Sequence, residues 1–183
     1  RGAGASSEVV GEVCINTSMT GYQEVLTDPS YSGQLIAFTF PHIGNVGTNL
    51  EDSEALAPAA LGCILRESIS EPANWRAIQH FNTWLKSFGI TAITGVDTRR
   101  LTNHIRNSGA PSGTLIFTPG SVPDITYAHN KALHFPGLEG MDLAKEVTCK
   151  EAYNFNELEK NLGTGSFYEP NLKYHIVAVD FGV

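Results

Sequence analysis

The sequence predicts an α/β domain with a mixed sheet and helices covering one side of it. Three observations favour this fold class. Segments with strand character come first and are followed by helix, strand, helix and strand in alternation. One early segment is apolar along most of its length, as in a strand buried on both faces. The 183-residue chain is 42% hydrophobic and 17% charged, a composition typical of an ordinary globular protein.

The expected strands are short apolar segments bounded by turn or helix signals. They cover residues 8–15, 34–40, 61–65, 91–96 and 113–117. A further segment, YHIVAVDFGV at 174–183, has the pattern of a central parallel strand with apolar side chains on both faces. Because nothing follows it in this sequence, we expect its neighbours to come from a second α/β domain that the sequence omits.

A helix and a sharp turn are expected in the hydroxyl-rich segment NTSMTGYQEVLTDPSYSGQ, between the first two strands. Thr20 followed by Gln23 fits a capping box for a short helix over residues 22–27. The sequence DPSY at 28–31 then matches a type I turn with proline at its second position. Ser30 is therefore held on a stiff corner. Its hydroxyl either contacts a bound molecule or bonds to its own backbone.

Two longer helices are expected further along the chain. One opens at Ser70 in the sequence SEPA, with proline in the first turn, and ends at Gly89. Asp97 is the expected N-cap of the other helix, which Gly109 stops. The side chains expected to face the core are Trp75, Ile78, Phe81, Trp84, Leu85, Phe88, Leu101 and Ile105.

Composition argues against several classes of partner. The net charge is −7, and the 12 Lys and Arg residues are scattered rather than clustered, so nucleic acid is not expected. No apolar run approaches the roughly 18 residues that cross a bilayer, and no secretion signal opens the chain. Cys14, Cys63 and Cys149 form an odd, widely spaced set without a C-x-x-C. We therefore expect a reducing, cytoplasmic setting in which each cysteine is a small, mostly buried structural residue.

No catalytic or metal-ligating constellation emerges from the motifs. Cys63 follows Gly62 but lacks the second glycine of a nucleophile elbow. The six histidines have no spacing that would place two of them on one metal. GNVGTN at 44–49 has glycines that could present N–H groups to an anion, without the Lys-Ser/Thr of a P-loop. These residues indicate a binding or scaffolding role.

Five collinear blocks together resemble the small, glutamine-hydrolysing subunit of carbamoyl-phosphate synthetase. They are GEVCINTSMTGYQEVLTDPSYSGQ (11–34), PHIGNVGTN (41–49), GVDTRRLTNHIRNSGAPSG (95–113), FPGLEGMDLAKEV (135–147) and VAVDFG (177–182). The resemblance implies that residues 1–135 form the subunit's N-terminal domain, a three-layer β/β/α fold. It implies a connecting segment and linker over 136–173, and then the first strand of a missing class I glutaminase domain at 174–183. The composition of NLGTGSFYEPN separately predicts a linker at 161–171.

The same resemblance implies a function. In this family the glutaminase domain carries a Cys-His-Glu site, so residues 1–183 are expected to be inactive alone. Ammonia released from glutamine passes to a large subunit, which uses bicarbonate and ATP to make carbamoyl phosphate for arginine and pyrimidine synthesis. No cofactor is expected in this chain, because ATP and Mg²⁺ belong to the large subunit. The implied partners are that subunit, the chain's own glutaminase domain and glutamine.

Three residues match positions with a role in the family. Ser30 lies where the family has a serine that contacts bound glutamine, which gives the stiff corner a purpose. Ser18 and Met19 match the segment near the start of the ammonia path. The alternative from a different functional class is a stand-alone protein-interaction or anion-binding module, with residues 44–49 as its site.

Overall fold

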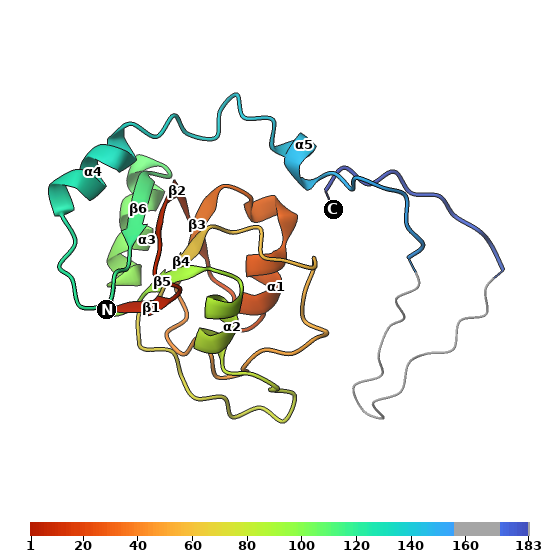
Figure 1. Ribbon diagram of the computed structural model, residues 1–183, viewed down its shortest axis with the longest axis horizontal. Helices are drawn as coiled ribbons and strands as arrows, with labels where there is room; N and C mark the ends of the chain where they lie inside the picture. Colours follow the sequence, from red (N-terminus) through yellow and green to blue (C-terminus); the bar gives the residue numbers. More distant parts are fainter. Residues whose placement is uncertain (156–172, 183) are drawn as a thin grey trace.

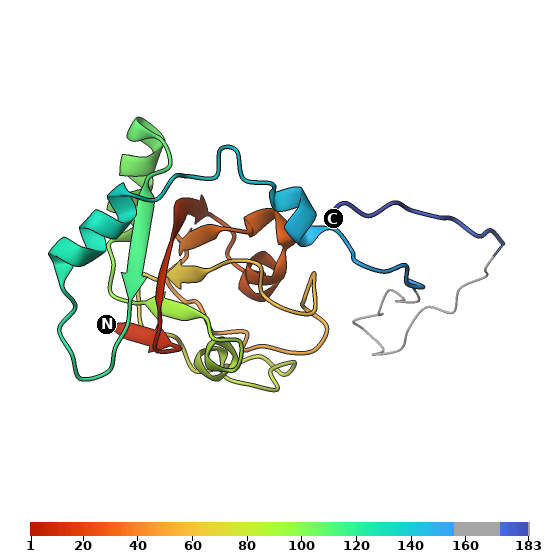
Figure 2. The same ribbon diagram turned by 45° about the horizontal axis from the view of Figure 1, so that its top comes forward.

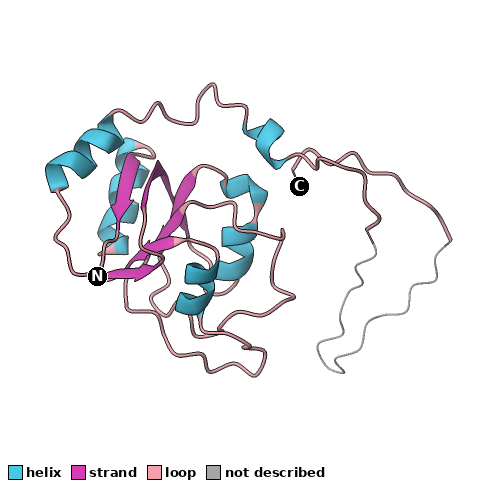
Figure 3. Ribbon diagram, in the orientation of Figure 1, coloured by secondary structure: helices cyan, strands magenta, loops and turns pink. Residues whose placement is uncertain are grey.

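The computed structural model describes residues 1–155 and 173–182 and contains one six-stranded mixed sheet (Figures 1 and 3). In spatial order the strands are β1 Gly2–Gly4, β5 Thr91–Ile93, β4 Gly62–Ile64, β3 Gln34–Phe38, β2 Glu8–Asn16 and β6 Ser112–Ile116. The four central strands run parallel, whereas β1 and β6 run antiparallel to their neighbours at the two edges. The predicted α/β class and mixed sheet are confirmed, and the five predicted strands correspond to β2 to β6.

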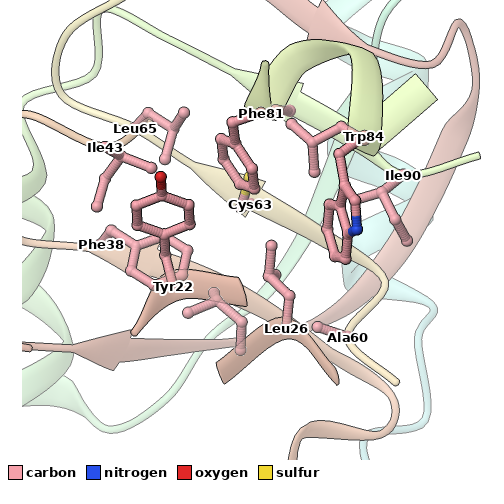
Figure 4. Packing of buried hydrophobic residues seen from close by; sticks show 13 residues of the cluster. Tyr22, Leu26, Phe38, Ile43, Ala60, Cys63, Leu65, Phe81, Trp84 and Ile90 are labelled. Atoms are coloured by element: carbon pink, nitrogen blue, oxygen red, sulfur yellow. The ribbon is translucent and has the colours of Figure 1, made fainter. Parts of the chain in front are cut away.

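One face of the sheet packs against helices α1 Tyr22–Thr27 and α2 Phe81–Ser87. The register aligns Cys14, Ile36, Cys63 and Ala92 across the four parallel strands, and all four contribute to the cluster on this face. Figure 4 shows the aromatic rings of both helices packed over the strands in this cluster. Burial of these side chains, at roughly 25 cal/mol per Å² of apolar surface, is the main force that holds the helices to the sheet.

The opposite face packs against helix α3 Thr98–Ser108. Five buried side chains from the strands form the cluster here, and Leu101 and Ile105 of α3 pack against it as predicted. These five are Val13, Leu35, Ala37, Ile64 and Leu115. Helices therefore cover both faces of the sheet, and the prediction that they cover only one side is wrong. Adjacent strand residues such as Leu35 and Ile36 are both apolar because each face is covered.

The sheet curls until its two edges approach each other (Figure 2). Leu115 on β6 reaches over Gly62 on β4, although β3 and β2 lie between these strands. A Cβ at Gly62 would lie 3.0 Å from Leu115 Cδ1. At the edges, a Cβ at Gly2 would overlap the ring of Phe117, and the Phe117 N–H donates to the carbonyl of Ser7 at 3.0 Å. Small residues on the strands therefore permit the curl.

Helix α1 has the predicted bounds but not the predicted cap. Its N-cap is Gly21, in a left-handed conformation with φ 81°, and no side chain caps the helix. Thr20 is exposed, while Gln23 is buried and bonds instead to the backbone of Asn49. The capping-box prediction is wrong because a tertiary contact takes the glutamine side chain.

Helix α2 begins at Phe81 rather than near Ser70, with the ring nitrogen of His80 accepting the cap bond from the Asn82 N–H. The preceding residues bond to the loop after β3: the N–H groups of Ser70, Ala73 and Ile78 donate to the carbonyls of Ile43, Asn45 and Thr48. These bonds compete with a helix over 70–80. As a result Trp75 is 77% exposed and Ile78 66%. Phe88, the C-cap of α2, is 42% exposed. These three were expected in the core, which in fact receives Phe81, Trp84 and Leu85.

Two short helices, α4 Ile125–Leu133 and α5 Leu143–Val147, follow the sheet. Helix α4 packs beside β6 and β2, with Tyr127 and Lys131 both bonded to the carboxylate of Glu8. None of the helices in the described ranges is long and apolar enough to cross a bilayer.

The predicted strand at 174–183 is not formed over its described part, residues 174–182. Most of these residues are exposed, and their contacts are with the residues after α5 begins, with Gly182 against Val147 and Cys149 beside Asp180. A strand needs a neighbouring strand to pair with, and residues 1–155 do not offer one here. The linker predicted at 161–171 lies outside the described residues, and the domain boundaries stay predictions.

Candidate functional site

The corner that contains Ser30 is a local structure built by Asp28 and Pro29. One turn of 3-10 helix, η1 Pro29–Tyr31, follows directly after α1. The Asp28 carboxylate accepts from the Ser30 N–H at 2.8 Å, and the Asp28 carbonyl accepts from the Tyr31 N–H at 3.1 Å. Proline sets the φ angle that this turn requires. The predicted type I turn is confirmed.

The corner leaves the hydroxyl of Ser30 available. The residue is exposed, and its own N–H is already satisfied by Asp28. Across residues 1–155 and 173–182, no hydrogen bond involves the Ser30 Oγ. A hydroxyl can donate one hydrogen bond and accept two, so this group can meet either a carbonyl or an amine of a ligand. The reading in which the hydroxyl only stabilises its own turn has no bond to support it.

A chain of hydrogen bonds connects the corner with the hydroxyl-rich segment that holds Ser18 and Met19. Asn16, the last residue of β2, donates through Nδ2 to the Tyr31 hydroxyl at 3.2 Å. Its Oδ1 accepts from the Ser18 N–H at 3.0 Å, and its carbonyl accepts from the Thr39 N–H at 3.0 Å. Asn16 therefore ties together the end of β2, the segment at 17–20 and the corner.

All three residues predicted for the site are exposed. Ser18 and Ser30 present hydroxyls, and the Met19 side chain is 69% exposed. None of the three side chains is charged. Together they offer two hydroxyls for hydrogen bonding and one thioether surface. The sequence arguments missed Asn16 and Tyr31, which hold these segments in place. The one signal that could have identified Asn16 is an asparagine at the end of a strand, just before a polar segment.

The segment after α4 crosses close to the corner. Gly33, at the end of the corner, has φ 76°. A Cβ at this position would lie 2.9 Å from Leu138 Cδ2 and 4.0 Å from Leu143 Cδ2. Glycine is therefore required at position 33 both for its backbone angle and for the close approach of Leu138.

The loop GNVGTN is a structural element rather than an anion cradle. The Gly47 N–H donates to the Gly44 carbonyl at 2.9 Å, and the Thr48 N–H donates to the Gln79 carbonyl at 2.9 Å. The Asn49 N–H donates to Gln23 Oε1 at 3.0 Å. Three of the six N–H groups of the loop therefore already have partners and four of the six residues are buried, which argues against the loop as an anion site.

The cysteines of the folded part are poor nucleophiles. Cys63 is fully buried, and burial raises the pKa of its thiol to about 12. Burial also raises the pKa of the half-buried Cys14 to about 11. The thiolate is the reactive form, so both residues stay inert at neutral pH. Cys149 is exposed beyond α5, so the prediction that all three cysteines are mostly buried is wrong for this residue. In the described ranges no three His, Cys, Asp or Glu side chains form a group that could hold a metal ion.

The sequence also matches a known family of proteins. The family model described as "Carbamoyl-phosphate synthase small chain, CPSase domain" matches residues 1–115, which is more than half of the chain. The chain belongs to the carbamoyl-phosphate synthase small-chain family. The matched span contains the corner, the segment at 17–20 and all but the last residue of the six-stranded sheet.

Individual small chains of this family align with the whole of this chain. The carbamoyl phosphate synthase small chain of Agrobacterium fabrum is 48% identical over 188 residues, which cover 100% of this chain and 47% of that protein. The small chain of Rhizobium meliloti is 47% identical with the same coverage, and that of Zymomonas mobilis is 46% identical with 49% of its length covered. The chain thus spans about half the length of the curated small chains it matches.

Proposed function

We propose that this chain works as the N-terminal part of the glutamine-hydrolysing small chain of carbamoyl-phosphate synthase. In this role it docks to the large chain in the cytoplasm and contributes to the glutamine pocket and the ammonia path. The large chain binds ATP and Mg²⁺ and uses ammonia with bicarbonate to make carbamoyl phosphate for arginine and pyrimidine synthesis. The proposal is supported by family membership and by 48% identity to a small chain along the full length of this chain.

The observation that carries the proposal is the free hydroxyl on the proline-braced corner. The Asp28 carboxylate accepts from the backbone N–H of Ser30, so the turn does not depend on a hydrogen bond from the Ser30 hydroxyl. A group held in place before its ligand arrives loses little entropy on binding. We assign Ser30 a hydrogen bond to glutamine. We assign the rest of the pocket to a glutaminase domain.

Ser18 and Met19 are assigned to the start of the ammonia path. Ammonia has to travel as the neutral molecule, because the ammonium ion is not a nucleophile. A lining of small hydroxyls and a thioether suits this need, since neither group protonates ammonia at neutral pH. The bonds through Asn16 support a path that begins beside the glutamine corner, because they connect Ser18 with Tyr31, the neighbour of Ser30.

The hydrolytic chemistry is assigned to the glutaminase domain and its Cys-His-Glu site. Cys63 is fully buried and Cys14 is half-buried, and burial raises the pKa of both thiols so that neither supplies a thiolate to attack an amide. We therefore expect residues 1–183 alone to release no ammonia from glutamine. Release of ammonia by the purified chain would contradict this assignment.

The test is the substitution Ser30→Ala in the full-length small chain, assembled with its large chain. Loss of one hydrogen bond, worth about 0.5 to 1.5 kcal/mol, should raise the KM for glutamine by roughly 2- to 12-fold. Carbamoyl phosphate synthesis from added ammonia should not change, because free ammonia bypasses the glutamine pocket. Ser32→Ala, two residues away on the same turn, is the matched control. Glutamine kinetics equal to those of the unmodified protein would refute the role of Ser30.

A second variant separates the position of the hydroxyl from its chemistry. Asp28→Ala removes the acceptor that holds the Ser30 N–H but keeps the hydroxyl itself. We expect a rise in the KM for glutamine that is smaller than that of Ser30→Ala. If Asp28→Ala had no effect while Ser30→Ala did, the hydrogen bond from Asp28 to the Ser30 N–H would not be needed to position the hydroxyl.

A further inference from the structure

The outward face of α3 is a patch of positive charge. Three arginines of this eleven-residue helix are exposed, and the helix carries no acidic residue. They are Arg99, Arg100 and Arg106. Arg99 and Arg106 are seven residues apart, so they lie on nearly the same line along the helix, about 10.5 Å from each other. The inward face holds Leu101 and Ile105 against the sheet, so the arginines have to point outward.

The three arginines are not neutralised by the described part of the chain. Within residues 1–155 and 173–182, Arg99, Arg100 and Arg106 form no ion pair. The nearest acidic residue in sequence, Asp97, is the N-cap of α3 and pairs with Arg66 at 3.6 Å. The chain as a whole has a net charge of −7, so the positive charge of this helix contrasts with the negative charge of the rest of the protein.

The position of two of these arginines is unfavourable for the helix itself. Arg99 and Arg100 lie in the first turn of α3, where the helix dipole favours acidic side chains and disfavours cations. The first turn itself holds no acidic residue, and the carboxylate of the N-cap Asp97 accepts from the backbone N–H of Arg100 at 3.1 Å and pairs with Arg66. Residues that work against local stability without a partner inside the fold are typical of functional surfaces.

We propose that the outward face of α3 docks onto an acidic patch of the large chain of carbamoyl-phosphate synthase. This inference rests on the proposed function, which supplies the large chain as the partner. Arginine suits the task because its planar guanidinium binds carboxylates through two parallel hydrogen bonds and is less strongly hydrated than lysine. An extended polyanion such as nucleic acid would be repelled by the rest of this acidic chain. A folded partner can meet one helix face with a local acidic patch.

The test measures the affinity of the full-length small chain for its large chain at low and at high ionic strength. In the double variant Arg99→Glu/Arg100→Glu we expect the affinity at low salt to fall about 10-fold or more, mainly through slower association. The steep salt dependence of the unmodified complex should disappear with it. Arg99→Lys/Arg100→Lys keeps the charge and should retain most of the affinity. Lys145→Glu/Lys150→Glu, at two exposed lysines elsewhere, makes the same change in net charge and should leave the affinity unchanged.

The fold of the variant gives a second readout. Because glutamate suits the first turn of a helix, Arg99→Glu/Arg100→Glu should melt no lower than the unmodified chain while it binds more weakly. If this variant failed to fold, Arg99→Gln/Arg100→Gln would carry the test with a smaller loss of affinity. Unchanged affinity in the folded variants, or an equal loss in the Lys145/Lys150 variant, would overturn the assignment of α3 and leave the proposed function standing. Absence of any binding between the unmodified chains would overturn the proposed function itself.

Discussion

The side-chain amide of Gln23 forms two hydrogen bonds with the backbone of Asn49. Gln23 Nε2 donates to the Asn49 carbonyl at 2.7 Å, and Gln23 Oε1 accepts from the Asn49 N–H at 3.0 Å. Both residues are buried. The side-chain amide of Gln23 thus satisfies both backbone groups of Asn49, as a residue of a paired strand would. These two bonds hold the loop after β3 against α1.

The first prediction is that Gln23→Ala destabilises the chain. The substitution leaves a buried N–H and a buried carbonyl of Asn49 without their partner, which costs about 1 to 3 kcal/mol. The free energy of unfolding, measured in urea, should fall by that amount. Asn103→Ala, on the exposed face of α3, serves as the control and should change little. A Gln23→Ala variant as stable as the parent would mean that water replaces the amide without cost.

The second prediction concerns Gly62, the residue beneath Leu115. A methyl group at position 62 would lie 2.7 Å from the Thr91 carbonyl oxygen and 3.0 Å from Leu115 Cδ1. Since the first of these atoms is backbone, β4 and β5 have to move apart, and we expect Gly62→Ala to cost about 1 to 3 kcal/mol. Thermal unfolding followed by circular dichroism measures the loss. Ser108→Ala, at the exposed end of α3, is the comparison. A melting temperature equal to the parent's would show that the sheet is less tightly curled than described.

The third prediction separates the three cysteines by their reactivity. At neutral pH a thiol reagent such as DTNB should modify Cys149 fast and Cys14 slowly. It should reach Cys63 only when the chain unfolds, since Cys63 is fully buried and its pKa is raised to about 12. The number of thiols that react in buffer and in denaturant is the measurement. Cys149→Ser should remove the fast phase alone. A fast phase that survives this substitution would contradict the burial of the other two cysteines.

The fourth prediction is a pH dependence that comes from Glu24. Burial raises the pKa of this carboxyl above its ordinary value of 4.5, and the charges of Asp52 and Glu54 raise it further. A raised pKa means that the folded state holds the proton more tightly than the unfolded state. Glu24 therefore favours folding at low pH, and this contribution is lost as the pH rises through the folded-state pKa. We expect Glu24→Gln to stabilise the chain at pH 7 relative to the parent, with the difference shrinking below pH 4.

Urea unfolding at several pH values tests this prediction. Glu139→Gln replaces an exposed glutamate and should give the same curve as the parent at every pH. A Glu24→Gln variant less stable than the parent at pH 7 would contradict the sign of the effect.

The local signals of the sequence predicted the structures that their own neighbouring residues determine. The apolar segments locate β2 to β6 within a few residues, and the Asp97 and Gly109 signals bound α3. The type I turn at DPSY forms because aspartate and proline act on their own neighbours. The corner that presents Ser30 could therefore be predicted without knowledge of the fold.

The errors all involve distant partners. β1 has the sequence GAG, with no strand pattern, and exists because it pairs with β5. The aromatic spacing around Trp75 resembles a helix, but the hydrogen bonds to residues 43–48 prevail over it. Asn16 joins Ser18 to Tyr31 only because β2 ends where it does relative to the corner. Such contacts depend on the register of strands that are far apart in sequence.

The two edges of the sheet set the order of events during synthesis on the ribosome. β1 has to wait for its partner at residues 91–93, and one edge of β2 has to wait for residues 112–116. Until the last of these has left the exit tunnel, both early strands keep unpaired backbone groups and apolar side chains in contact with solvent. The nascent polypeptide is therefore most in need of chaperones until residues 112–116 have emerged, and a stop codon placed before residue 112 should yield an insoluble product rather than a smaller folded one.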